Sequence, residues 1–209
     1  MREYMQGHWN PGTYEGYDCA HPRRIGPSGD GGKMVCLDAV PTAPAPCFVL
    51  SVGVGGDPGQ PPDFRFEIAL HQQLPHCDIH VYDGTNFGRG PIRNAPPYVH
   101  FFPENFTPNT WRKYAKMPHG VSIFKIDCEG CEFDGGVAAF LDRVPTEQLL
   151  IEVHAHGGRP LNQLTNFMTA VNKTHGIFYR EPNIQHSDGT CIEFAFRKRG
   201  GRVLRSRAR

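Results

Sequence analysis

Four carboxylates lie within eight residues of each other, directly after an apolar run. The segment 125–134 reads Lys-Ile-Asp-Cys-Glu-Gly-Cys-Glu-Phe-Asp. Asp127 and Glu129 are two residues apart, so their side chains share a face if the backbone there is extended. Like charges this close raise one another's pKa unless a cation or a hydrogen-bond donor lies between them. We therefore expect Asp127 and Glu129 to be catalytic groups of one pocket; a divalent cation between them is compatible with the sequence but not required by it.

A glycine-rich turn is the second feature with a chemical use. Residues 47–57 read Cys-Phe-Val-Leu-Ser-Val-Gly-Val-Gly-Gly-Asp, which predicts a buried strand that runs into the turn. Glycine has no Cβ and takes positive φ freely, so Gly53 and Gly55 leave room for a nucleotide or its ribose above the strand end. The same pattern also occurs in tight turns that bind no ligand.

An acid ends the next predicted strand, 78–83, which follows a helix predicted over 64–74. In nucleotide-binding α/β folds, an acid at this position accepts hydrogen bonds from both ribose hydroxyls of an adenosine. This favours a cofactor role for Asp83 over that of a simple turn former before Gly84.

His154 ends a further predicted strand, 148–154. Glu152 and His154 alternate there with apolar residues, so one face of the strand end is polar. The reference pKa of histidine lies near neutrality, which makes His154 a candidate general base. An ordinary hydrogen-bonded histidine at a strand end is the alternative.

These segments alternate as strands and helices do in an α/β domain. We expect a Rossmann-like, mostly parallel sheet that binds its ligand at the carboxyl ends of the strands. A helix is predicted over 161–175 from its apolar periodicity, and an antiparallel strand pair, 177–180 and 191–196, is expected at one edge of the sheet.

Composition excludes some classes of protein. The formal net charge of +1 does not indicate a nucleic-acid substrate. No apolar stretch is long enough to span a bilayer. The seven cysteines form no zinc framework, and acids flank the Cys128-x-x-Cys131 pair, which argues against a redox-active thiol. Compartment and oligomeric state stay open.

The segment 125–132 resembles a motif of FkbM-like enzymes, a group of the class I S-adenosylmethionine-dependent methyltransferases. Their fourth strand reads Lys-Ile-Asp-Val-Glu-Gly-Ala-Glu, and six of these eight residues agree with the present chain. Residues 51–57 are similar to the cofactor loop of that family, and Phe66-Glu67 is similar to the start of the helix that follows.

The resemblance implies S-adenosylmethionine as the cofactor and a class I methyltransferase fold. Two departures stand out: Ser51 and Val52 precede the glycines where many relatives have an acid, and no Asn-Pro-Pro-Tyr motif follows the fourth strand, which argues against an amide or adenine nitrogen as the acceptor. The expected cofactor-binding residues are Ser51, Gly53, Gly55, Asp57, Glu67 and Asp83, and the expected catalytic residues are Asp127, Glu129 and His154.

The function implied is methyl transfer to a hydroxyl of a small molecule or a sugar, with a small-molecule or glycan substrate as partner. One alternative is an NAD(P)-dependent Rossmann oxidoreductase, although its third glycine would fall at Pro58. Another is a binding module that keeps the fold without catalysis, which the missing acid before Gly53 favours.

The expected organisation has three parts. Residues 1–46 form an irregular N-terminal arm and lid loop, 47–196 the methyltransferase-like domain, and 197–209 a basic, disordered tail. Within the arm, the glycine-rich stretch 24–33 is either a lid over a bound cofactor or only a hairpin turn.

Overall fold

The computed structural model describes residues 19–55, 61–85, 95–133, 136–154, 161–183 and 191–200. Asp57, residues 1–18 of the predicted N-terminal arm and residues 201–209 of the predicted tail lie outside this part of the chain.

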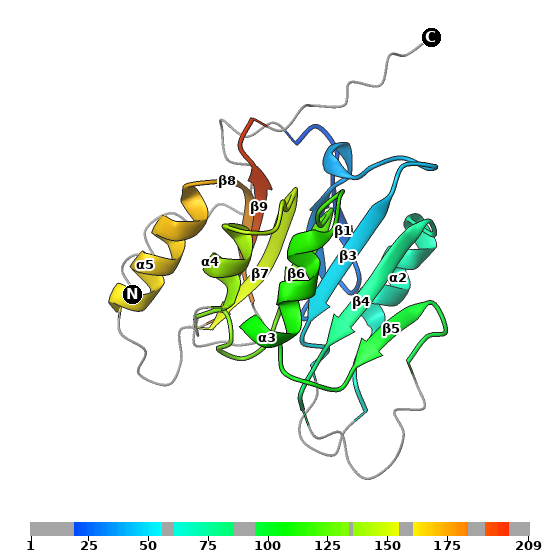
Figure 1. Cartoon of the computed structure of the whole chain (residues 1–209), viewed down its shortest axis with the longest axis horizontal. Coiled ribbons are helices and arrows are strands. Elements are labelled where there is room, and N and C mark those ends of the chain that lie inside the picture. Colours follow the sequence, from blue (N-terminus) through cyan, green and yellow to red (C-terminus); the bar gives the residue numbers. More distant parts are fainter. Residues whose placement is uncertain are drawn as a thin grey trace.

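A mixed sheet forms the centre of the described structure (Figure 1), with the seven strands in the order β5-β4-β3-β6-β7-β9-β8. The five strands from β5 to β7 run parallel, and β9 lies antiparallel to both of its neighbours. This confirms the predicted Rossmann-like, mostly parallel sheet with a C-terminal antiparallel pair. The strands are β3 (Cys47–Val52), β4 (Cys77–Tyr82), β5 (Val99–Phe102), β6 (Ile123–Ile126), β7 (Gln148–His154), β8 (His175–Pro182) and β9 (Cys191–Lys198).

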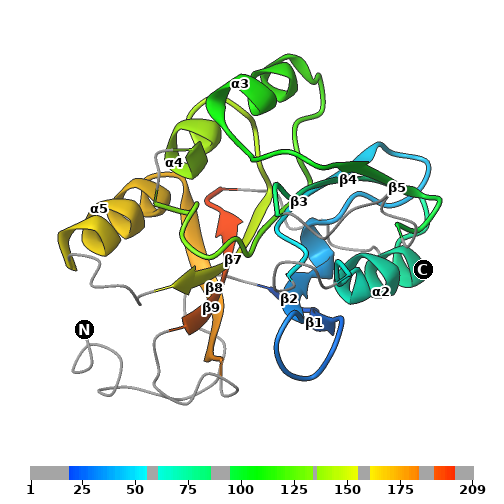
Figure 2. The ribbon, with the colours of Figure 1, turned by 90° about the horizontal axis from the view of Figure 1, so that it is seen from below.

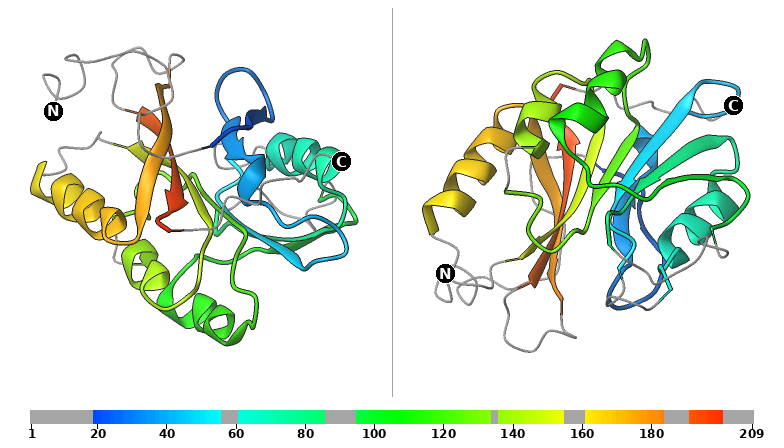
Figure 3. Two further views of the ribbon diagram at one scale, coloured as in Figure 1. Left: turned by 90° about the horizontal axis from the view of Figure 1, so that it is seen from above. Right: turned by 60° about the horizontal axis from the view of Figure 1, so that its bottom comes forward.

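Helices cover one face of the sheet, and a hairpin with one helix covers the other (Figures 2 and 3). Every residue of β3 and β7 is buried, as expected for parallel strands with both faces covered. The first face carries α3 (Pro108–Trp111), η2 (Arg112–Lys116), α4 (Gly136–Leu141) and α5 (Leu161–Asn172). The second carries β1 (Pro22–Ile25), β2 (Lys33–Cys36), η1 (Leu37–Ala39) and α2 (Arg65–Gln73).

Alternate residues of each strand build two separate cores. Leu50 and Phe124 pack with Trp111 and Phe140 on the helical face. Val49 packs with the hairpin and α2 on the other. Side chains alternate between the two faces of a strand. Because both faces of the central strands are covered, most residues of these strands are apolar on either face.

Several element ends differ from the prediction. The helix α5 ends at Asn172 because β8 already begins at His175. The strand β9 continues to Lys198, and Arg197, the first residue of the expected tail, is buried opposite Gln148.

The stretch 24–33 forms the turn of the antiparallel hairpin β1–β2, which was one of its two predicted forms. The side chain of Gln148 fastens this hairpin to β7: its Oε1 accepts from the Cys36 amide at 2.7 Å, and its Nε2 donates to the Cys36 carbonyl at 2.9 Å. Whether residues 1–46 also act as a lid stays a prediction.

Six of the seven cysteines are paired as Cys19–Cys36, Cys47–Cys77 and Cys128–Cys131. The seventh, Cys191, is buried on β9. Disulfides of this number are typical of proteins from oxidising compartments. In the described ranges, no helix has both the length and the apolarity that crossing a membrane requires.

Candidate active site

A pocket of about 1030 Å³ opens where β3, β4 and β6 end. This is the carboxyl edge of the parallel strands, where open α/β sheets bind their ligands. The volume is at the upper end of that of small-molecule sites, which run to about 1,000 Å³. Five of the predicted site residues line it: Gly53, Gly55, Asp83, Asp127 and Glu129.

Gly53 and Gly55, the two predicted glycines, have different structural roles in the turn after β3. Gly53 has φ +81°, and a Cβ there would clash with the carbonyl oxygen of Asp127, so this glycine permits close approach of two strand ends. Gly55 has φ +62°, and a Cβ there would meet no atom within 4 Å. The backbone at Gly55 is therefore open on the pocket side.

Asp83 is fixed against this turn by backbone amides. Its Oδ2 accepts a hydrogen bond from the Val54 amide at 2.8 Å, and its Oδ1 accepts one from the Thr85 amide at 2.7 Å. Each carboxylate oxygen has a second lone pair, so Asp83 can still accept two further hydrogen bonds from a ligand.

Ser51 and Glu67, both predicted at the cofactor, contact each other instead. The Ser51 hydroxyl donates to Glu67 Oε1 at 2.6 Å, and both residues are buried. Neither is among the described residues that line the pocket. Burial raises the pKa of Glu67, and the charge of Lys125 opposes this shift. The Lys125 ammonium also donates a hydrogen bond to the Gly53 carbonyl. Ser51, Glu67 and Lys125 therefore stabilise the glycine turn from the protein interior.

Lys33 is the main site residue that the sequence did not predict. It comes from β2, is 2% exposed, and places its ammonium 2.9 Å from Asp127 Oδ2 and 3.7 Å from Glu152 Oε2, with a further hydrogen bond to Glu193. Burial would lower the pKa of Lys33, but the three carboxylates outweigh burial and raise it above its usual value. Lys33 is therefore a cation at this site.

Asp127 is correspondingly held in its ionised form. Burial would raise the pKa of its carboxyl, but the charges of Lys33 and Lys125 outweigh burial and hold the pKa well below the usual range. Glu193 behaves in the opposite way, because burial raises its pKa to about 8. At neutral pH the pocket thus presents Asp127 as a fixed anion.

Glu129 and His154 lie on the other side of Asp127. Glu129 has the positive φ of 55°, and its side chain is 71% exposed. Its Oε1 is 3.5 Å from His154 Nε2, while His154 Nδ1 is 3.3 Å from Glu132 Oε1. His154 is buried and, in the described part of the chain, is not a lining residue of the pocket.

The carboxylates around His154 affect its pKa. Burial would lower its pKa, but the hydrogen bond and charge of Glu132, with the charges of Glu129 and Glu152, raise it to about 9. A histidine that is protonated near neutral pH has no lone pair with which to take a proton, and the catalytic role of His154 stays a prediction.

The hairpin closes the pocket on the side of Lys33. Asp30 and Gly31, at its tip, are lining residues. The side-chain nitrogen Nδ2 of Asn183 donates to Asp30 Oδ1 at 3.0 Å and to Glu152 Oε1 at 2.9 Å. These two hydrogen bonds connect the hairpin tip to β7. Asp30, Asp127 and Glu152 each have a ligand atom within 4.8 Å of the others, so these three could hold a divalent cation.

The family description of a methyltransferase domain matches residues 3–198 of the chain. The chain belongs to this methyltransferase family. Membership decides against the oxidoreductase alternative and supports S-adenosylmethionine as the expected cofactor. It does not single out the FkbM-like subgroup, which stays a prediction.

Solved structures give the same fold for this methyltransferase. The fibrillarin pre-rRNA processing protein of Methanococcus jannaschii has a TM-score of 0.51 at 9% identity, over 91% of this chain and 88% of that one. Fibrillarin in complex with Nop5p has a TM-score of 0.51 at 12% identity, over 72% of each chain. At these identities the likeness shows the fold alone, and it confirms the class I methyltransferase fold. A search of curated proteins gave no match.

Proposed function

We propose that the protein transfers a methyl group from S-adenosylmethionine to a hydroxyl group of a small molecule or a sugar. The observation that carries this proposal is that Asp83 and Asp127, at the ends of β4 and β6, face one pocket on either side of the glycine turn that ends β3. In this proposal Asp83 binds the cofactor and Asp127 binds the acceptor.

The cofactor half consists of the turn and Asp83. The two remaining lone pairs of Asp83 suit the two ribose hydroxyls, and hydrogen bonds to a charged group contribute about 1.5–3 kcal/mol each. The open backbone at Gly55 leaves room for the ligand beside them. Ser51 and Glu67 contribute by holding the turn, since they lie beneath it.

The acceptor half consists of Asp127 and Glu129. Bound S-adenosylmethionine supplies an electrophilic methyl group, so the protein must align the acceptor and help to remove its proton. Asp127 is ionised and accepts a hydrogen bond from the acceptor hydroxyl, which aligns it. Glu129 is exposed to the pocket and takes the proton as the hydroxyl attacks, while His154 orients its carboxylate.

A sugar or small-molecule acceptor agrees with the surroundings of this site. The pocket wall carries several carboxylates, which would repel the phosphates of a nucleic acid. The choice of a hydroxyl of a sugar or small molecule rests on these carboxylates, because the fold alone does not indicate the acceptor.

The test combines binding with turnover. Calorimetry of one preparation with S-adenosylmethionine, S-adenosylhomocysteine and NAD should show binding of the first two only. Transfer of radiolabelled methyl groups to a panel of hydroxylated sugars, small metabolites and RNA should label a hydroxyl compound. Binding of S-adenosylhomocysteine without transfer to any acceptor would favour a non-catalytic module, and labelled RNA alone would overturn the acceptor class.

A further inference from the structure

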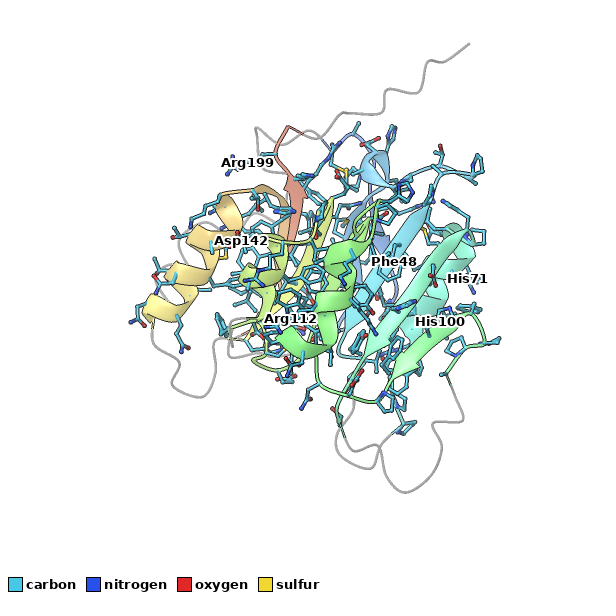
Figure 4. All side chains as sticks on the ribbon, in the orientation of Figure 1. Phe48, His71, His100, Arg112, Asp142 and Arg199 are labelled. Atoms are coloured by element: carbon cyan, nitrogen blue, oxygen red, sulfur yellow. A yellow bond between two sulfur atoms is a disulfide. The ribbon has the colours of Figure 1, made fainter. Side chains whose placement is uncertain are left out.

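Two histidines and an aspartate form a cluster away from the pocket. His80 on β4 and His100 on β5 are direct partners in the parallel register of these strands. Asp78 precedes His80 by two residues and therefore lies on the same face of the sheet. Figure 4 shows His100 on β5, at the edge of the described sheet. The cluster thus bridges the edge strand and its neighbour.

The distances in this cluster suit one metal ion. Asp78 Oδ1 is 3.2 Å from His100 Nε2, and Asp78 Oδ2 is 3.6 Å from His80 Nε2. One ligand atom from each residue lies within 4.8 Å of the other two. Zinc bonds of about 2.0–2.2 Å at tetrahedral angles separate neighbouring ligand atoms by about 3.3–3.6 Å. The two measured oxygen–nitrogen distances are close to this separation.

The ring of His80 is already oriented for coordination. Its Nδ1 is 3.1 Å from the Tyr114 hydroxyl, which is itself 2.8 Å from the Tyr82 hydroxyl. Tyr114 and Tyr82 are both buried. Histidine ligands of metals characteristically have their second ring nitrogen held by such a partner, which directs the first nitrogen at the ion. Here the partner leaves Nε2 of His80 directed at Asp78 and His100.

We propose that Asp78, His80 and His100 form a binding site for a divalent transition-metal ion, with zinc as the ion that fits best. Two imidazoles and a carboxylate are a ligand set that zinc accepts, and water completes the coordination on the exposed side. The bound ion fastens the edge strand β5 to β4. This site is separate from the pocket and does not depend on the proposed function.

The test is calorimetric titration of tag-free, chelator-treated full-length protein with zinc chloride. The wild type should bind zinc at a site that His100→Ala and His80→Ala each weaken by more than about a hundredfold, since even loss of an outer partner costs about 10–100-fold. Tyr114→Phe keeps the ring and should weaken binding by about 10–100-fold. His119→Ala, which removes an exposed histidine outside the cluster, should leave the affinity unchanged.

A second readout separates this site from the acids of the pocket. Zinc should raise the melting temperature of the wild type and of His119→Ala, but not that of His100→Ala. Because the His100 side chain is 62% exposed, its removal should leave the protein folded. Absence of zinc binding in the wild type, or unchanged zinc binding in His100→Ala, would overturn the proposal and leave the cluster as an ion pair on the surface.

Discussion

Lys33 Nζ lies 2.9 Å from Asp127 Oδ2, although 94 residues separate the two in the chain. The contact joins the N-terminal hairpin to the end of a central strand, where the family motif places its acids. The hairpin therefore also has a chemical role, because the Lys33 ammonium is the cation between Asp127, Glu152 and Glu193. The hairpin β1–β2 thus contributes to the site and also packs against one face of the sheet.

Lys33→Met should destabilise the protein by about 3–5 kcal/mol, because removing one partner of a buried ion pair leaves uncompensated charge. Urea unfolding measures the change. Turnover should fall as well, because the pKa of Asp127 would rise toward or above its usual value without Lys33. The pH at which activity reaches half its plateau should therefore shift upward in this variant.

Two variants complete that experiment. Lys116→Met removes an exposed lysine and should change the free energy of unfolding by less than about 0.5 kcal/mol. Lys33→Met combined with Asp127→Asn removes the ammonium and the ionised carboxylate beside it together, and should recover part of the lost stability. If Lys33→Met were as stable as Lys116→Met, the ammonium would not be needed to balance the carboxylates.

His154 should make the stability of the protein depend on pH. Folding raises its pKa from 6.5 to about 9, so the folded state binds the proton more tightly than the unfolded state does. Its contribution, on the order of 3 kcal/mol, is complete below about pH 6.5 and is lost as the pH rises through about 9. His154→Gln should therefore flatten the fall in stability across this interval, measured by urea unfolding at several pH values.

His119→Gln is the matched control, because it changes an exposed histidine and should keep the wild-type pH profile. Glu193 also titrates in this interval, but it is present in both variants and does not affect the comparison. An unchanged slope in His154→Gln would mean that His154 is neutral in the folded protein, and would return it to the list of candidate bases.

The sheet and the position of the pocket could be predicted because they follow from local patterns. Apolar runs and glycines mark the central strands and their ends, and parallel strands bring Gly53, Asp83 and Asp127 to one edge whatever lies between them. Gly53 was predicted as a ligand contact, and its close approach to Asp127 shows a packing reason as well.

Lys33 and His154 show why the long-range contacts and the protonation states of the site could not be predicted from the sequence. The hydrogen bond from Lys33 to Glu193 spans 160 residues, and no local pattern specifies it. The pKa of His154 depends on Glu132, which the sequence places 22 residues away and the fold places beside it. Ser51 and Glu67 look like cofactor ligands in the sequence because a buried polar pair and a ligand contact leave the same residue types.

Asp83→Ala should weaken S-adenosylhomocysteine binding by more than about a hundredfold. The change removes two hydrogen bonds to a charged acceptor, worth about 1.5–3 kcal/mol each, and every 1.4 kcal/mol is about tenfold in affinity. Calorimetry measures it directly. The Val54 and Thr85 amides also lose their acceptor, so circular dichroism should first show that the variant is folded.

Asp142→Ala, an exposed acid beyond the end of α4, is the control and should bind as the wild type does. Wild-type affinity in folded Asp83→Ala would remove Asp83 from the cofactor site. The glycine turn would then have to bind its ligand in another orientation.

Asp127→Asn and Glu129→Gln should each reduce turnover by about a hundredfold or more, the usual scale for loss of a positioned acid or base. Both side chains line the pocket, and both changes keep nearly the same volume. Cofactor affinity should change much less, because Asp83 and the glycine turn remain. Rates of methyl transfer to an identified acceptor, with calorimetry of each variant, measure the two effects separately.

A chelator distinguishes two roles for Asp127. Lys33 already supplies a cation beside its carboxylate, so we expect turnover to survive chelator treatment. If chelator stopped turnover and magnesium or manganese restored it, Asp30, Asp127 and Glu152 would be the ligands to test, since they are close enough to share an ion. Asp142→Asn, a change at an exposed acid that is not among the described lining residues of the pocket, should leave turnover unchanged. Full activity in both Asp127→Asn and Glu129→Gln would mean that these acids do not act on the acceptor, and that the base must be sought elsewhere along the pocket wall.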